Sequence, residues 1–228
     1  MKTIGIIAAS DNELAPFLAS FEVTRKVKKV MLTFYECRHN DIMVIAVYSG
    51  VGKVNAAIAT QTMIDCFHVN CIISVGTCGS LAGKMKIFDT LIADSCLYHD
   101  LEATILTAFH PWMETAIFRC SPALVAMAAD CTVEYPVHFG LLATGDYFLD
   151  SEEQRKKLLA EYPDVLGVDM ESSAIAHVCY VNCVPFLAVR TVTDDGQNNA
   201  EEVFFSNVDK AAERSCHVCL KLFCLMET

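Results

Sequence analysis

The chain has 228 residues, of which 54% are hydrophobic, and its formal net charge is −11. This composition is ample to bury the core of one large α/β domain without disulfides or metal staples. The negative charge disfavours nucleic acids and anionic lipid as partners, and no apolar run approaches the roughly 20 residues that span a bilayer.

Short β-rich apolar runs alternate with amphipathic stretches along the chain, which is typical of an α/β fold. The predicted strands are Thr3–Ala8, Val30–Glu36, Ile42–Tyr48, Cys71–Val75, Thr90–Ala93, His138–Ala143 and Pro185–Val192. The predicted helices are Asp11–Phe21, Val54–Phe67, Pro122–Asp130, Glu152–Glu161, Glu171–Tyr180 and about Val208–Leu225. With no linker rich in Pro, Gly or Ser and no internal repeat, residues 1–228 are predicted to form a single domain.

The first residues, the early basic segment and the cysteines bear on the cellular compartment and on burial. The run Thr3–Ala9 is short and acidic residues follow it at once, so we expect a buried first strand and not a secretory signal. Since no export signal is recognised, we expect a reducing cytoplasm and free thiols. The cations Arg25, Lys26, Lys28 and Lys29 are expected in a solvated turn. Most of the twelve cysteines lie in apolar runs, where Cys acts as a small hydrophobe, as at Cys66, Cys71, Cys131, Cys179 and Cys183.

Two Gly-rich segments each follow a predicted strand. Ser49–Lys53 has the G-x-G pattern but lacks the third glycine of a dinucleotide fingerprint, so it indicates either ligand contact or a tight turn. Val75–Ser80 also ends a strand. Since ligands of open α/β sheets sit beyond the carboxyl ends of strands, the two segments together predict one shared crevice.

Three acidic segments are candidates for chemistry. Val168–Ser173 places Asp169 and Glu171 just before a helix, where they could also serve as helix cap and first-turn acid. Asp194 lies at the mouth of an apolar strand, either as an acid or within an Asp-Asp-Gly turn. Glu13 lies at the start of the first predicted helix, where capping explains Asp11 and Asn12 better than it explains Glu13.

Cysteine and histidine spacing raises the possibility of a metal. Cys216–Cys219 has the C-x-x-C spacing, and Cys96 and His99 form a second nearby pair. Zinc normally takes four ligands from two matching pairs, whereas Cys216–Cys219 falls inside a helical pattern without a matching partner. We therefore expect no metal.

Five segments occur together in the order and spacing of one family: Gly5–Ala9 followed by Glu13, Ser49–Lys53, Val168–Glu171, Glu171–Cys179 and Arg190–Asp194. In these segments the chain resembles the methylthioadenosine/S-adenosylhomocysteine nucleosidases of the nucleoside-phosphorylase superfamily, from Met1 to about Leu222. The resemblance implies a three-layer α/β/α sandwich with a mixed, partly closed central sheet, a homodimer, a small-molecule nucleoside as substrate and no cofactor.

The resemblance also assigns roles. Asp194 is expected to protonate N7 of the purine, Glu13 to activate water, and Glu171 to hold the ribose hydroxyls. These roles suit the chemistry, because breaking the N-glycosidic bond leaves charge on the purine and an oxocarbenium-like sugar. The other expected substrate-binding residues are Met170 under the sugar, Phe148 and Leu149 at the base, Thr77, Cys78 and Gly79 along the cleft, and Asp169, Val51, Ser10, Phe204, Thr193 and Phe109.

The chain departs from the family pattern where the 5′ substituent would bind. Ser10 stands where a Met commonly closes the pocket, and Asp169 replaces a usual Glu. The segment between Asp100 and Thr107 is longer than in the family, and Phe204–Asn207 replaces the usual Phe-Asp-Glu-Phe of a loop over the site. These changes predict a roomier, more polar 5′ pocket, suited to a homocysteine or futalosine tail. The alternative is that a neighbouring apolar side chain compensates for Ser10 and that the longer segment is a surface bulge.

Two other functions remain open. A phosphorylase would need a phosphate pocket, usually with arginines near the Gly-rich turns, and both turns lack Arg. A silent nucleoside-binding protein would not need Glu13, Glu171 and Asp194 together. We therefore predict a hydrolase that releases the purine from methylthioadenosine, S-adenosylhomocysteine or a futalosine-type nucleoside.

Overall fold

Strands and helices alternate through the computed structural model, which describes residues 2–81, 83–109, 113–195 and 200–226. The strands are β1 (Lys2–Ala8), β2 (Glu22–Lys29), β3 (Leu32–His39), β4 (Ile42–Tyr48), β5 (Cys71–Ser80), β6 (Thr90–Tyr98), β7 (Ile117–Arg119), β8 (Val137–Thr144), β9 (Val165–Asp169) and β10 (Phe186–Asp194). The helices are α1 (Asp11–Ser20), α2 (Lys53–Phe67), α3 (Ala103–Phe109), α4 (Pro122–Ala129), α5 (Glu152–Glu161), α6 (Ser172–Val181) and α7 (Ala200–Met226).

One mixed sheet contains all the described strands, in the order β10-β6-β8-β9-β5-β1-β4-β3-β2 with β7 on β6. Strand β10 pairs in parallel with β5 and antiparallel with β6. Strands β5, β10, β6, β8 and β9 therefore close a ring, while β1, β4, β3 and β2 extend from β5 as an open sheet. This is the partly closed mixed sheet that was predicted.

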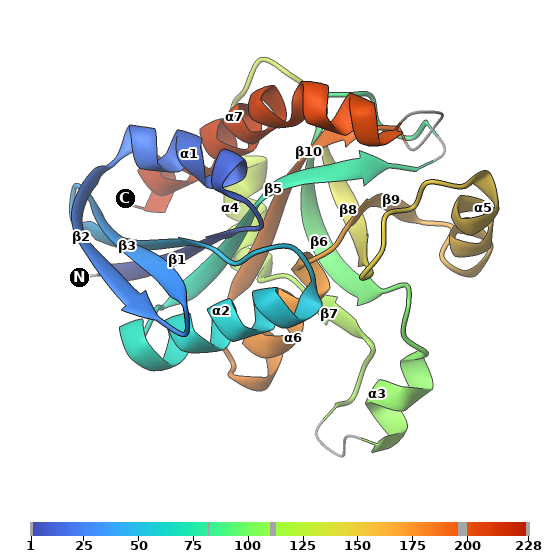
Figure 1. Cartoon of the computed structure of the whole chain (residues 1–228), viewed down its shortest axis with the longest axis horizontal. Coiled ribbons are helices and arrows are strands. Elements are labelled where there is room, and N and C mark those ends of the chain that lie inside the picture. Colours follow the sequence, from blue (N-terminus) through green and yellow to red (C-terminus); the bar gives the residue numbers. More distant parts are fainter. Residues whose placement is uncertain (1, 82, 110–112, 196–199, 227–228) are drawn as a thin grey trace.

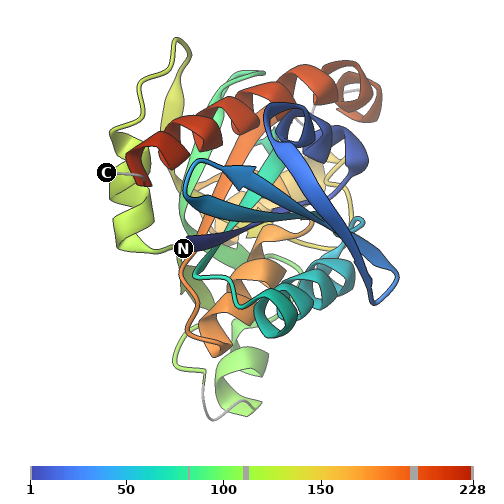
Figure 2. The ribbon, with the colours of Figure 1, turned by 90° about the vertical axis from the view of Figure 1, so that its left-hand side faces the viewer.

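Helices cover both faces of the sheet (Figure 1). Helix α7 packs on α1, β5 and β10 along one face, and α2 packs on α6 along the other. Viewed from the side, α4 lies next to α7, and the open β1–β4 end of the sheet passes between the two helical layers (Figure 2). The arrangement confirms the predicted three-layer α/β/α sandwich.

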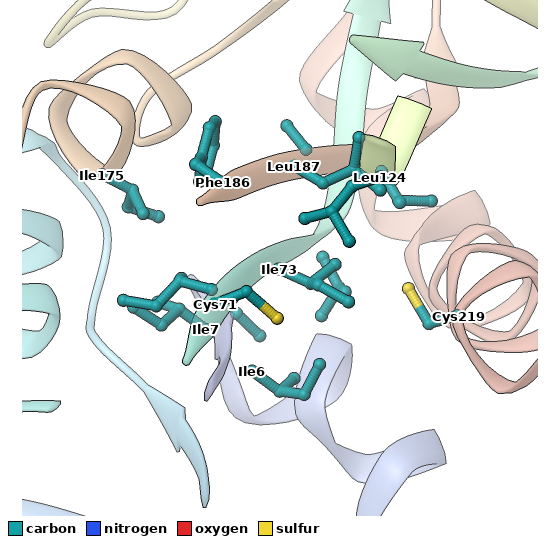
Figure 3. Close-up of a cluster of buried hydrophobic side chains, with 14 of the residues drawn as sticks. Ile6, Ile7, Cys71, Ile73, Leu124, Ile175, Phe186, Leu187 and Cys219 are labelled. Atoms are coloured by element: carbon teal, nitrogen blue, oxygen red, sulfur yellow. The ribbon is translucent and has the colours of Figure 1, made fainter. Parts of the chain in front are cut away.

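The core lies on both faces of the central strands, which explains why these strands read as continuous apolar runs. Ile6 and Ile7 are adjacent in β1 and point to opposite faces, as successive strand residues must. Figure 3 shows Leu124 of α4 and Cys219 of α7 on one side of β5 and β10, and Ile175 of α6 on the other. Both faces of the parallel strands are thus buried.

The cysteines behave only in part as small hydrophobes. All twelve lie among the described residues, and none forms a disulfide. Cys71 and Cys179 are buried as expected, and burial raises the pKa of the Cys71 thiol to about 11. Cys66 and Cys183 are exposed, which corrects the expectation for those two. Cys66 lies on the solvent side of α2, which an apolar run does not reveal, and Cys183 lies in the turn after α6 with a left-handed φ of 55°.

The predicted turn at Arg25–Lys29 is wrong, because these residues lie in strand β2. This strand pairs antiparallel with β3 along its whole length and forms an edge of the sheet. Its cations are exposed, and such charges suit an edge strand because they oppose pairing with another chain. The turn lies instead at Val30 and Met31, which have left-handed φ angles of 44° and 67°. The strand predicted from Val30 therefore begins at Leu32.

Other boundaries also differ from the prediction. Strands β5, β6 and β10 extend to Ser80, Tyr98 and Asp194, beyond their predicted ends at Val75, Ala93 and Val192. The Gly-rich turn expected at Val75–Ser80 is therefore part of a strand. Strands β7 and β9 and helix α3 were not predicted, and α7 begins at Ala200, eight residues before the predicted start at Val208. Within the described residues, no helix combines the length and apolar character required to cross a membrane.

Candidate active site

A cavity of about 380 Å³ opens where the parallel strands β1, β5 and β10 end, as expected for a ligand site in such a sheet. It brings together fourteen of the fifteen residues singled out from the sequence, from segments far apart in the chain. They are Ser10, Glu13, Val51, Thr77, Cys78, Gly79, Phe148, Leu149, Asp169, Met170, Glu171, Thr193, Asp194 and Phe204.

Hydrogen-bond donors just after β1 and within β5 hold the Glu13 carboxylate in place. Its Oε2 accepts from the Ala9 and Ser10 backbone N–H groups at 3.0 and 3.1 Å, and from the Ser10 hydroxyl at 3.3 Å. Its Oε1 accepts from the backbone N–H and the hydroxyl of Thr77 at 2.8 and 2.9 Å. Ser10 is the N-cap of α1 and forms a capping box with Glu13. Ser10, and not Asp11 or Asn12, caps this helix.

Gly76 makes room for Glu13. Its φ is +145°, and a Cβ placed there would lie 2.8 Å from the Glu13 carboxyl carbon. Only glycine allows the carboxylate to approach the β5 backbone this closely. The Gly-rich character of Val75–Ser80 is therefore explained by the approach of a side chain within the strand.

Asp194 is the last residue of β10 and is 3% exposed. The Thr193 hydroxyl lies 3.0 Å from Asp194 Oδ2 and 3.2 Å from the Cys78 carbonyl, so it can donate to one of them at a time. Register shifts between Val192 and Asp194 where β10 pairs with β5, and the carboxylate faces Gly79. The irregularity places a carboxyl group at the end of a strand that is buried throughout.

Glu171 lies at the N-cap position of α6 but does not cap it. Its Oε1 accepts instead from the Gly52 backbone N–H at 2.9 Å, and the side chain is buried in the cavity wall. Gly50 and Gly52 have φ of +85° and +99°, so the Ser49–Lys53 segment is both a tight turn and a wall of the cavity. Burial, reinforced by Asp169 and Glu13, raises the pKa of Glu171 to about 8.

Asp169 supports the site through the backbone. It pairs with buried Arg190 at 2.9 Å, accepts from the Thr144 hydroxyl, and accepts from the Ser172 backbone N–H at the start of α6. Arg190 also donates to the Ser74 hydroxyl at 2.7 Å. Asp169 lines the cavity as predicted, and its oxygens accept hydrogen bonds from protein donors that hold the start of α6 in place.

Apolar and aromatic side chains complete the walls. Phe148 is 39% exposed at the rim, whereas Leu149 is buried. Phe204 and Phe205 approach from α7, so the segment Phe204–Asn207, which was expected as a loop, is helical here. Asn207 donates to the Thr193 carbonyl at 2.9 Å and ties this helix to the strand end that carries Asp194.

Sequence reasoning missed several lining residues, above all Arg155, His99 and Tyr147. Arg155 lies on α5, which was read as a charged surface helix, and nothing in its spacing distinguishes it from neighbouring cations. His99 directly follows strand β6, and that position was a usable signal. Burial lowers the pKa of His99, against an opposing effect of Asp100.

Phe109 is the one predicted residue that does not line the cavity. It lies at the end of α3 and is 77% exposed. The long segment expected near the 5′ pocket lines a separate cavity instead, with Leu101 and Leu106 among its walls. Within one chain, therefore, the α3 region does not contribute to the site.

Cys216–Cys219 does not form a metal site. Among the described residues, no cluster of three or more His, Cys, Asp or Glu side chains could hold a metal ion. Cys216 and Cys219 are core residues of α7. Cys96 is likewise buried, whereas His99 belongs to the cavity wall.

Comparison with known proteins gives a consistent result. The sequence model of the phosphorylase superfamily matches residues 3–223. The 5′-methylthioadenosine/S-adenosylhomocysteine nucleosidase of Staphylococcus aureus (strain JH9) is 35% identical over 217 residues, which are 93% of this chain and 95% of that protein.

Solved structures agree with the sequence comparison. The 5′-methylthioadenosine/S-adenosylhomocysteine nucleosidase of S. pneumoniae with a transition-state inhibitor superposes with a TM-score of 0.91 at 29% identity, covering 98% of this chain and 99% of that one. The futalosine hydrolase of Helicobacter pylori strain 26695 superposes with a TM-score of 0.90 at 28% identity, covering 98% and 97%.

Proposed function

This chain belongs to the phosphorylase superfamily, and from that premise we propose that it hydrolyses the N-glycosidic bond of a 5′-substituted purine nucleoside, with Asp194, Glu13 and Glu171 as the groups that act on the substrate. The observation that carries the proposal is the convergence of three buried carboxyl groups from different elements on one cavity. Its relatives named above are nucleosidases that act on N-glycosyl bonds.

The chemistry divides between two ends of the bond. Asp194 donates a proton to N7 of the purine, so the electron pair of the breaking C1′–N9 bond leaves with a neutral base. Water attacks C1′ of the oxocarbenium-like sugar, and Glu13 takes its proton. Each such acid or base contributes typically about 10²–10⁴-fold in rate. Glu13 is already oriented by Thr77 and the start of α1, so its geometry need not be built during the reaction.

Glu171 is proposed to bind the ribose hydroxyls. Its second oxygen, Oε2, receives no hydrogen bond from the described residues and lies in the wall that also contains Met170. Buried polar groups without a protein partner are suited to bind one from the substrate. Met170 supplies an apolar floor beneath the sugar.

The 5′ end is proposed to lie near Ser10, Val51 and Phe204. The Ser10 side chain is small and its hydroxyl is hydrogen-bonded to Glu13. It therefore leaves space in the cavity for the 5′ substituent. Phe205, also on α7, is 68% exposed and lines the cavity, so it can cover a longer 5′ tail. We therefore include methylthioadenosine, S-adenosylhomocysteine and futalosine-type nucleosides among the candidate substrates.

A phosphorolytic reaction is the second candidate, and the charges of the cavity oppose it. Among the described lining residues, the acidic side chains outnumber the single Lys or Arg, which is Arg155. Arg190 is buried against Asp169 and does not line the cavity. A phosphate dianion would be repelled by the Glu13 carboxylate that is proposed to act as the base, whereas water would not.

A homodimer is proposed from the exposed hydrophobic side chains of α2 and α3. Val54 and Ile58 of α2 and Ile105 and Phe109 of α3 are all exposed, and both helices lie on the same side of the molecule (Figure 1). Exposed apolar patches of this kind mark interaction surfaces. In such a dimer the α3 region of one chain would contribute to the site of the other.

The decisive experiment is a panel of 5′-substituted purine nucleosides assayed with and without phosphate. We expect free base and a free reducing sugar in both conditions. Strict dependence on phosphate, with a sugar 1-phosphate as product, would establish the phosphorylase instead. If no substrate releases base while nucleosides still bind, the chain is a nucleoside-binding protein.

A further inference from the structure

Lys53 ends the Gly-rich segment Ser49–Lys53, and the proposed chemistry does not use it. A lysine that follows such a turn contacts phosphate in P-loops, whereas this ammonium is paired within the protein. Lys53 Nζ lies 2.8 and 2.7 Å from the two carboxylate oxygens of Asp100, 3.6 Å from Asp146 Oδ2, and 5.4 Å from the centroid of the Tyr98 ring. None of these residues lines the active-site cavity, so the cation acts on its protein surroundings and not on the substrate.

Lys53, Asp100 and Asp146 form a clasp (the Lys53 clasp) that joins three segments of the cavity wall. Asp100 Oδ2 accepts from the Asp146 backbone N–H at 2.9 Å, and Asp146 Oδ1 accepts from the Lys53 backbone N–H at 2.8 Å. The three residues come from the start of α2, the end of β6 and the segment after β8. Each lies within two residues of a side chain that lines the cavity, namely Val51, His99 and Tyr147.

The pair between Lys53 and Asp100 is largely withdrawn from water. Their side chains are 23% and 14% exposed, against 75% and 74% for Lys156 and Glu152, a pair on the surface of α5. Burial acts to raise the pKa of Asp100, but hydrogen bonds from Lys53 and from the Asp146 N–H hold it below its ordinary value. Solvent and salt screen such a pair less than an exposed one, so it constrains its surroundings more strongly.

Gly52 connects the Lys53 clasp to Glu171. Two consecutive backbone N–H groups each hold a carboxyl group: that of Gly52 donates to Glu171 Oε1 at 2.9 Å, and that of Lys53 donates to Asp146. Gly52 has a φ of +99°, and a Cβ there would lie 3.3 Å from Asp146 Oδ1, so the turn and Asp146 are in close contact. The orientation of the Gly52 N–H is thus coupled to the position of Asp146.

The ammonium of Lys53 lies between two carboxylates, those of Asp100 and Asp146. Without this shared cation the two carboxylates would repel each other, and Asp146 would withdraw from the Lys53 N–H. The Gly52 turn would then lose its fixed geometry, and with it the donor that orients Glu171. We propose that Lys53 is a positioning residue that holds the Gly52 N–H, and through it the Glu171 carboxyl group, in place for the ribose hydroxyls. The assignment rests on the proposed nucleosidase function and adds a residue to its sugar-binding side.

The test compares 5′-methylthioadenosine with its 2′,3′-dideoxy analogue, which lacks the hydroxyls that Glu171 is proposed to bind. Lys53→Met removes the ammonium and keeps the apolar stem. It should lower kcat/KM about tenfold for the riboside and less than about threefold for the dideoxy analogue, because only the riboside uses an oriented Glu171. Asp100→Asn should reproduce this pattern, so the test does not depend on one variant.

Two further variants are controls. Lys53→Arg keeps a cation that can pair with both oxygens of Asp100, so it should keep most of the wild-type kcat/KM. Lys156→Met breaks the exposed pair with Glu152 and should leave kcat/KM for both substrates unchanged within about twofold.

A double-mutant cycle with Glu171→Gln tests the route from Lys53 to Glu171. In that background Lys53→Met should change kcat/KM for the riboside less than about threefold, because the group that Lys53 positions is already altered. Equal losses on the two substrates, or the full tenfold loss in the Glu171→Gln background, would overturn the positioning role even if the enzyme is a nucleosidase.

Calorimetric binding of the same two nucleosides separates this proposal from the nucleosidase function. If wild type cleaves neither nucleoside, the nucleosidase proposal fails, and the ratio of the two affinities still tests Lys53. The preference for the riboside should fall in Lys53→Met and persist in Lys156→Met, whereas an unchanged preference would overturn the role of Lys53. A wild type that binds neither nucleoside would overturn both proposals.

Discussion

The carboxyl groups of the cavity share a location but not an environment. Glu13 accepts five hydrogen bonds from backbone and hydroxyl donors, whereas Glu171 accepts one, from Gly52. Asp194 lies at the end of a fully buried strand, beside the Thr193 hydroxyl. Different surroundings can shift the protonation of groups of one chemical type, as the proposed roles of acid, base and ligand require.

Asp194→Asn is expected to abolish base release while substrate binding persists. The amide keeps the size of the side chain but cannot donate a carboxylic proton to N7, so the rate should fall by about 10²–10⁴-fold. Single-turnover release of base measures the loss, and binding of a non-hydrolysable analogue is the control for an intact site. A variant that keeps more than about a tenth of the wild-type rate does not fit an acid at this position.

Glu171→Gln is expected to change how stability depends on pH. The folded state raises the pKa of Glu171 from its ordinary 4.5 to about 8, so the native protein binds this proton more tightly than the unfolded chain. Wild type therefore loses stability from this group as pH rises from about 4.5 to about 8. Glutamine has no such proton, so the Tm of the variant relative to that of wild type should rise as pH increases through this range.

Thermal unfolding of both proteins from pH 5 to pH 9 checks this expectation. Each pKa unit corresponds to about 1.4 kcal/mol, so a raised pKa of this kind is readily measured. The amide of glutamine can still accept from the Gly52 backbone N–H, so the fold should be kept. A Tm difference that does not vary with pH would mean that Glu171 is not held in its protonated form by the fold.

At the scale of elements, the site depends on the backbone of β5. This strand is central to the sheet and contacts β1, β10 and β9, so its position is fixed on both sides. Gly76 lies in it opposite Arg190, with an unusual φ of +145°. The strand thus supplies structural rigidity and also the space into which the Glu13 side chain fits.

Gly76→Ala is expected to reduce kcat strongly by displacing Glu13. The added methyl group would overlap the carboxyl group, and the positive φ disfavours any side chain. Loss of an oriented base should cost on the order of 10²-fold or more in kcat, and backbone strain should lower stability by about 1–3 kcal/mol. Steady-state kinetics and chemical denaturation measure the two effects.

Gly83→Ala is the matched control for backbone strain. Gly83 also has a positive φ, +64°, but a Cβ there would meet nothing within 4 Å. It should lose stability through strain and keep its kcat. Equal losses of kcat in the two variants would attribute the effect to strain and not to displacement of Glu13.

At the scale of the whole molecule, the exposed apolar side chains of α2 and α3 predict a dimer. Static light scattering should give twice the chain mass of 25.1 kDa. Ile58→Asp should shift the protein toward the monomer, because a buried unpaired charge at an interface is costly. Met31→Asp is the control, since Met31 is fully exposed in the β2–β3 turn, away from these helices. A monomeric wild type, or equal shifts in both variants, would contradict the prediction.

The sequence by itself determined the class of fold and most of the site. Continuous apolar runs separated by amphipathic stretches require buried strands between helices, and this pattern is local. Glu13 and Asp194 could be singled out because each follows or ends a predicted strand, and Glu171 because it directly precedes a predicted helix, all within a family pattern. The carboxyl ends of parallel strands meet at one edge, so residues from distant segments could be expected in one cavity.

The tertiary structure alone decided the closure of the sheet and the identity of several site residues. Pairing of β10 with both β5 and β6 depends on contacts between distant segments, for which single strands carry no signal. Strand β2 reads as a charged turn because an edge strand with one solvated side needs few apolar residues. Arg155 looks like any surface cation until the fold places α5 against the cavity, whereas Phe109 leaves it because the fold turns α3 outward. Local sequence records which residues prefer burial, and only packing decides which of them share a site.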